Sequence, residues 1–258
     1  MHKYKIILEY DGANYRGWQK QKNAKSVQET LTAAAEEFLG APADIQGAGR
    51  TDAGVHALAQ VAHLETEKLV DPGSLRAGLN EILPETITVL SVENAHPRFH
   101  ARHHAVARSY LYLVATRRSA FARRYAWWVQ EDLDLEAMRT ALDLFRGFHD
   151  FTSFTDKRME KGSSTQVSVE GLWMRKFDDI IAMRVLGSHF LWKMVRRIMG
   201  VIVEAGRGNL TVPEIEGMLL SYSEVPKKCT APAHGLFLET VLYEGDSLPE
   251  MRLPLAVW

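Results

Sequence analysis

The order of the elements predicted from hydrophobic periodicity is the strongest constraint on the fold. Strands follow a period of two and helices a period of 3.6. The first predicted elements are strand, helix, two strands, helix and strand, at residues 3–10, 26–40, 44–46, 57–64, 74–82 and 87–92. A second set comprises a strand, a helix, a strand hairpin, two helices and a last strand, at 109–115, 135–145, 167–186, 189–204, 212–220 and 236–242. We therefore predict an α+β protein of two halves, 1–104 and 105–258. The strand at 87–92 is apolar on both faces and is predicted to be buried on both sides.

One segment places a carboxylate beside a guanidinium between two glycines. It reads Gly49-Arg50-Thr51-Asp52-Ala53-Gly54-Val55-His56-Ala57. Such a turn lets the backbone approach a ligand, and a nearby arginine favours the ionised form of an aspartate. Asp52 is therefore a candidate nucleophile or base. The alternative is that Asp52 only caps a turn, because Asp and Gly are common turn residues.

Positive charge is concentrated in the middle of a chain whose formal net charge is −1. Between Asn94 and Gln130 lie seven arginines, four histidines and no acidic residue, with aromatic residues among them. Guanidinium groups bind phosphates through paired hydrogen bonds, and aromatic rings stack on bases. The pattern favours a surface that binds RNA or DNA over a merely solvated charged face.

Cysteine content and hydropathy indicate the compartment. The single cysteine, Cys229, excludes an internal disulfide and a cysteine-rich zinc site, which fits a reducing environment. The sequence has no run of about 18 apolar residues, the length that would predict a membrane span. We therefore expect a soluble cytoplasmic protein. His100, His103 and His104 lack a neighbouring cluster of carboxylates or thiols, which disfavours a metal site.

Eight short motifs occur in order along the chain and together resemble the bacterial tRNA pseudouridine synthase A family. They are Tyr10-Asp11-Gly12, Gly17-Trp18-Gln19, the Gly49 to Ala57 segment, Phe99-His100-Ala101-Arg102, Arg108-x-Tyr110, His149-Asp150-Phe151, Met194-Val195-Arg196 and Gly235-Leu236-x-Leu238. Two departures stand out. Ala59 occupies a position where the family usually has glycine, and an arginine usually found near residues 165–169 is absent.

The resemblance implies two ferredoxin-like or RNA-recognition-like halves that share a mixed, mostly antiparallel sheet, in a homodimer. It also implies isomerisation of uridine to pseudouridine at positions 38, 39 and 40 of the tRNA anticodon stem-loop, without a metal or a cofactor. The reaction exchanges an N-glycosidic for a C-glycosidic bond with no redox step, and a carboxylate nucleophile divides it into two easier stages.

Residue roles follow from the same resemblance. Asp52 is expected to be the nucleophile, and Arg196 to pair with it across the interface of the two halves. Tyr110 is expected to stack on the target base and assist catalysis, and Leu236 to pack at that base. Arg50 either shares the pairing role or fills the space that the extruded base leaves.

Three arginines, Arg98, Arg102 and Arg108, are expected to bind the tRNA. Two other classes of protein remain as alternatives. A non-catalytic RNA-binding module would use the same basic stretch, and a glycosidase would need a second acidic residue near Asp52.

Overall fold

The computed structural model describes residues 1–156 and 164–254 of the 258-residue chain. They form two compact units. The first comprises Met1–Val106 and Phe237–Glu250, and the second comprises Ala107–Leu236 and the described residues from Met251 on. The C-terminal strand of the chain thus belongs to the same unit as the N-terminal strand.

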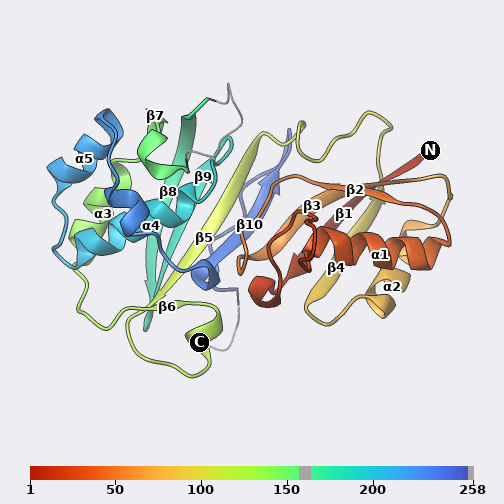
Figure 1. Cartoon of the computed structure of the whole chain (residues 1–258), viewed down its shortest axis with the longest axis horizontal. Helices are drawn as coiled ribbons and strands as arrows, with labels where there is room; N and C mark the ends of the chain where they lie inside the picture. Colours follow the sequence, from red (N-terminus) through yellow and green to blue (C-terminus); the bar gives the residue numbers. More distant parts are fainter. Residues whose placement is uncertain (157–163, 255–258) are drawn as a thin grey trace. The chain divides into compact units, whose positions relative to one another are not determined.

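The first unit combines a β-sheet with two helices (Figure 1). Its strands lie in the order β4 (Ile87–Asn94), β1 (His2–Tyr10), β3 (His56–Thr66) and β10 (Leu236–Leu242), and β2 (Asp44–Gly47) also pairs with β3. β1 is antiparallel to β3 and β4, whereas β10 is parallel to β3. The helices are α1 (Val27–Leu39) and α2 (Pro72–Ile82).

Local sequence explains where these elements begin and end. The Ser26 side chain caps α1 by accepting a hydrogen bond from the Glu29 amide, and Gly40 ends the helix in the left-handed conformation. Alternate residues of β1 (Tyr4, Ile6, Leu8 and Tyr10) are buried and form one wall of the core. The prediction that β4 is buried on both sides is wrong. Leu90 is 38% exposed, because β4 is the outer strand of this unit and only one of its faces is packed.

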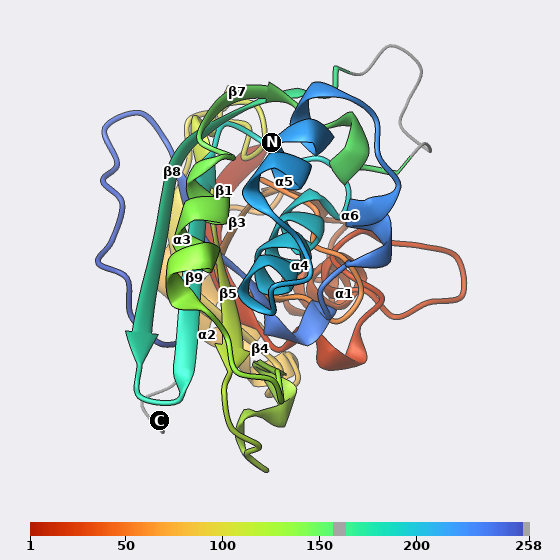
Figure 2. The same ribbon diagram turned by 90° about the vertical axis from the view of Figure 1, so that its left-hand side faces the viewer.

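The second unit contains an antiparallel sheet with helices on one face (Figure 2). Its strands lie in the order β5 (Ala107–Ala115), β9 (Ile180–Gly187), β8 (Gln166–Phe177) and β7 (Gly147–Asp150), and β6 (Trp127–Trp128) pairs in parallel with β5. The helices are α3 (Leu135–Asp143), α4 (Met194–Gly206), α5 (Val212–Leu220) and the short α6 (Val225–Lys228). The predicted α+β class with a mixed, mostly antiparallel sheet is confirmed.

The predicted helix at 189–204 begins too early. Lys193 has a φ of +62°, and α4 starts only at Met194. Phe190 and Met194 are four residues apart, so apolar spacing alone extended the helix across a turn. The Phe190 ring instead packs edge-on against Tyr110, with ring centroids 5.2 Å apart. The polar loop predicted at 154–164 lies mostly outside the described residues.

Candidate active site

Asp52 lies in the turn between β2 and β3, and the backbone on either side of it is fixed by hydrogen bonds. The hydroxyl of buried Thr51 is 2.8 Å from the Tyr10 hydroxyl, and the Thr51 carbonyl accepts from the Trp18 amide at 3.1 Å. The Asp52 carbonyl accepts from the Val55 amide at 3.1 Å. Asp52 itself is half-buried. The turn therefore holds a carboxylate in place while leaving it accessible.

Two glycines let the loop after β1 pack against this turn. A Cβ atom on Gly12 would lie 1.9 Å from the Val55 carbonyl oxygen, and one on Gly17 would lie 2.4 Å from the Thr51 carbonyl oxygen. Gly17 also has a φ of +94°, a backbone conformation that residues with a side chain rarely adopt. Three of the motifs, separated by up to 40 residues in sequence, thus form one packed assembly around Asp52.

Arg50 is exposed and is oriented by two glutamines rather than by the turn alone. Its Nε donates to Gln19 Oε1 at 3.0 Å, and Gln19 Nε2 donates to Gln28 Oε1 at 2.8 Å. Gln28 in turn donates to the Ile45 carbonyl at 2.7 Å. Sequence analysis did not assign a role to Gln19 or Gln28. The Gly17-Trp18-Gln19 motif was the available signal, but its contact with Arg50 depends on the fold.

His56 is a second residue whose role sequence analysis missed. It is buried, its Nδ1 accepts from the Gly12 amide at 3.1 Å, and its ring stacks on Phe237 at 4.8 Å. His56 is the first residue of β3, directly after the turn, and it therefore ties the loop after β1 to the start of that strand. Its contribution is to position the turn.

We expect Gly17→Ala to reduce both stability and turnover. The new methyl group meets backbone atoms that cannot move away, and the positive φ adds strain, together about 1–3 kcal/mol of lost stability. The matched control is Gly40→Ala, because Gly40 also has a positive φ but nothing lies within 4 Å of its Cβ position. Thermal unfolding and turnover of both variants test this. Equal turnover in the two variants would contradict the role of Gly17 in shaping the Asp52 turn.

Arg196 lies in the first turn of α4 and is held by the segment that precedes β10. Its Nε donates to the Ala231 carbonyl at 2.8 Å, and the Ala231 amide donates to the Arg196 carbonyl at 3.0 Å. Gly200, one turn further along α4, permits this approach, because a Cβ there would lie 1.6 Å from the Cys229 carbonyl oxygen. The side chain of Arg196 is thus half-buried and restricted to a narrow range of positions.

β5 carries Tyr110 close to the same region of the second unit. Tyr110 is 8% exposed and packs edge-on against Phe190. On the same face of β5, the Tyr112 hydroxyl donates to the Pro232 carbonyl at 2.9 Å, and burial raises the pKa of Tyr112. Leu236 is buried and follows Gly235, whose missing side chain makes room for the Tyr112 ring.

Arg197, next to Arg196, has a structural role. Its guanidinium is buried and donates to the carbonyls of Thr155 and, at 3.4 Å, Ser153. Burial lowers the pKa of Arg197 from its ordinary value. The helix therefore presents two adjacent arginines in different environments, one fully buried and one half-buried.

The three arginines expected to bind tRNA differ in environment. Arg98 and Arg102 are exposed in the first unit, where Arg98 precedes the Phe99-His100-Ala101-Arg102 motif and Arg102 ends it. Arg108 is half-buried in the second unit, where it donates to the Ser188 carbonyl at 2.9 Å. The basic stretch is therefore not one uniform face.

A buried histidine anchors the Phe99 motif and makes stability depend on pH. His63 on β3 accepts from the Ala101 amide at 3.2 Å. Its pKa is lowered from 6.5 to about 4, mainly by burial and then by the nearby positive charges of His100 and Lys3, while Glu65 opposes the shift. Between pH 6.5 and 4 the unfolded chain therefore binds more protons at this site than the folded protein.

We accordingly expect His63 to cost the protein stability as the pH falls below 6.5, reaching about 2–3 kcal/mol near pH 4, with no loss above 6.5. His63→Asn removes the titrating group and keeps an acceptor for the Ala101 amide. Chemical denaturation of both proteins from pH 7.5 to 4.5 measures the difference. If the variant loses stability as steeply as the wild type, His63 is not responsible.

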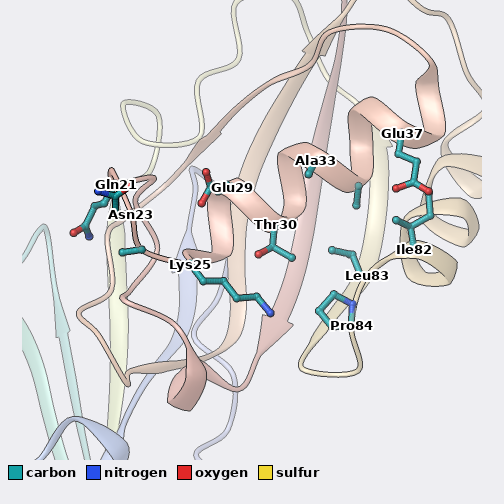
Figure 3. Close-up of a pocket in the computed structure, with 12 residues that line it drawn as sticks. Gln21, Asn23, Lys25, Glu29, Thr30, Ala33, Glu37, Ile82, Leu83 and Pro84 are labelled. Atoms are coloured by element: carbon teal, nitrogen blue, oxygen red, sulfur yellow. The ribbon is translucent and has the colours of Figure 1, made fainter.

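A hollow of about 580 Å³ lies in the first unit, beside α1 and the turn that follows α2, and Figure 3 draws the residues that line it. It is lined by Gln21, Asn23, Ala24, Lys25, Glu29, Thr30, Ala33, Ala34, Glu37, Ile82, Leu83 and Pro84. This lining contains one lysine, two glutamates and no aromatic ring. It does not resemble a site for a nucleic-acid base, and Asp52 is not part of it.

Within residues 1–156 and 164–254, no group of three or more His, Cys, Asp or Glu side chains is arranged to hold a metal ion. None of the helices in the described part of the chain has the length and hydropathy needed to cross a bilayer.

Comparison with known proteins identifies the family. The family model described as tRNA pseudouridine synthase matches residues 6–103 and 141–244. The chain therefore belongs to the tRNA pseudouridine synthase family. Two relatives are named tRNA pseudouridine synthase A. That of Acetivibrio thermocellus is 39% identical over 248 residues, which cover 94% of this chain and 100% of the relative. That of Maricaulis maris is 38% identical over 250 residues, which cover 96% and 100%. The predicted family and the enzyme class, an isomerase, are confirmed.

Proposed function

We propose that the protein converts uridine to pseudouridine at positions 38, 39 and 40 of the tRNA anticodon stem-loop, as a cytoplasmic homodimer. The observation that carries this proposal is the Asp52 turn, braced by the loop after β1, in a chain that belongs to this family. A partly accessible carboxylate on a fixed backbone suits a nucleophile, because the reacting oxygen is already positioned.

The target nucleotide must leave its stack before Asp52 can reach it. Extrusion costs a few kcal/mol and is easiest in a loop or at the end of a stem. Tyr110 stacks on the extruded base, and Leu236 packs at its edge. Arg98, Arg102 and Arg108 bind phosphates, which compensates for the extrusion. Arg50, on its glutamine support beside Asp52, fills the space that the base leaves.

Asp52 then forms a covalent adduct with the nucleotide, at the ribose anomeric carbon or at the pyrimidine ring. In both routes the N-glycosidic bond breaks, the base turns, a C-glycosidic bond forms, the bond between Asp52 and the nucleotide breaks, and the ring proton is removed from the base. Arg196 is the charge partner that orients the carboxylate, and Tyr110 assists proton removal. The exchange of one glycosidic bond for another requires no electron transfer.

The test is to map pseudouridines in a tRNA transcript with uridines at positions 38, 39 and 40, before and after incubation with the protein. We expect conversion at these positions, with the remaining uridines of the transcript as internal controls. Conversion only at other positions would refute the assigned specificity. Release of free uracil would indicate a glycosidase instead. Sedimentation equilibrium of the free protein tests the homodimer.

A further inference from the structure

The loop between β5 and β6, residues 116–126, exposes a phenylalanine ring. Phe121 is 82% exposed, although it is a large apolar side chain. It is followed by a short 3-10 helix, Ala122–Arg124, and the loop projects beyond the end of β5 (Figures 1 and 2). This loop contributes none of the proposed catalytic or tRNA-binding residues.

The loop is held in place, so the exposure of Phe121 is built into the fold. Ala122 and Ala126 are buried, and the Ala126 amide donates to the Ala122 carbonyl at 2.9 Å. The loop ends in β6, which pairs with the last two residues of β5. There Trp127 lies edge-on to Tyr112, while the Arg207 guanidinium sits 5.5 Å from its ring centroid.

Exposed arginines flank Phe121 in the sequence. Arg118 and Arg123 are exposed on either side of Phe121, and the Arg118 guanidinium lies 5.9 Å from the ring centroid of Trp128, which is itself 41% exposed. Arg117 is paired with Asp179 and adds little net charge. Exposed aromatic rings beside arginines are the combination that binds unpaired nucleotides, because rings stack on bases and guanidinium groups bind phosphates.

We propose that the loop at 116–126 is a second RNA-binding element, in which Phe121 stacks on an unpaired base of the tRNA other than the target uridine while Arg118 and Arg123 bind adjacent phosphates. The identity of the RNA rests on the proposed function. A second copy of the chain is the competing occupant. A two-fold interface centred on this loop would bring the same arginines face to face, and like charges so placed repel.

The experiment measures tRNA dissociation constants, their salt dependence and steady-state kinetics. Phe121→Ala should weaken tRNA binding roughly tenfold or more, because stacking on one base contributes an affinity factor of that order. It should raise KM and leave kcat at saturating tRNA unchanged. Phe121→Trp should retain wild-type affinity. The control Leu220→Ala removes an equally exposed apolar side chain (82%) from the end of α5 and should have no effect.

Arg118→Gln combined with Arg123→Gln should make the slope of log affinity against log salt less negative by about 1.4 to 1.8, because two phosphate contacts are lost. The control is Arg139→Gln, which removes an exposed arginine on α3 that pairs with Glu136.

Unchanged affinity in Phe121→Ala and an unchanged slope in the arginine variant would overturn the proposal. A loss of self-association with unchanged tRNA affinity would also overturn it and assign the loop to a second copy. If the wild type binds tRNA through Phe121 but forms no pseudouridine, the proposed function fails and this inference stands.

Discussion

Asp52→Asn and Asp52→Ala are expected to abolish pseudouridine formation while changing tRNA affinity only a few-fold. A nucleophile acts in the covalent step itself, so its removal typically lowers turnover by about 10,000-fold or more. Asparagine keeps nearly the same shape and can still accept hydrogen bonds, but its amide is a far weaker nucleophile than a carboxylate. The turn should also survive, because its hydrogen bonds involve the Asp52 backbone and the neighbouring Thr51. Single-turnover assays at saturating enzyme, with separate binding measurements, give both quantities.

Asp44→Asn is the matched control. Asp44 is an exposed aspartate on β2, the strand that leads into the same turn, and its loss should leave turnover near the wild-type value. Near-normal turnover in Asp52→Ala would refute the nucleophile assignment. It would also revive the alternative of an RNA-binding module in which Asp52 only shapes a turn.

Most elements that the sequence predicted correctly are long enough to show a period, and the four-residue strand β2 is the exception. α1, α2, α5, β1 and β3 have apolar residues at regular spacing and recognisable ends, such as Ser26 and Gly40 around α1. β6, β7 and α6 have two to four residues each, too few to show any period. The start of α4 was misplaced because only the backbone angle at Lys193 separates the turn from the helix.

The candidate site was predicted as individual residues but not as an assembly. The Asp52 turn was evident from its glycines and charges. The residues that support that turn could not be predicted from the sequence, because Gly17 and Gln19 act through contacts with segments more than 30 residues away. The burial of individual side chains could not be predicted from the sequence either. Arg196 and Arg197 are adjacent and chemically identical, and only the packing of α4 distinguishes them.

That distinction leads to opposite expectations for the two arginines. Arg196→Lys should lower kcat by about 100- to 1000-fold, because a single ammonium group does not reproduce the planar guanidinium that is proposed to pair with the Asp52 carboxylate. Its effect on stability should be about 1 kcal/mol, from loss of the hydrogen bond between Nε and the Ala231 carbonyl. The KM for tRNA should change little, since the proposed role is in the chemical step.

Arg197→Met should show the reverse. Methionine fills part of the buried space but leaves the carbonyls of Thr155 and Ser153 without their donor, which costs about 1–3 kcal/mol of stability. The folded fraction should retain most of its turnover. Denaturant unfolding together with kcat, measured on both variants, separates the two roles. A stability loss without a kcat loss in Arg196→Lys would show that Arg196 only ties α4 to Ala231, and Asp52 would then need a different charge partner.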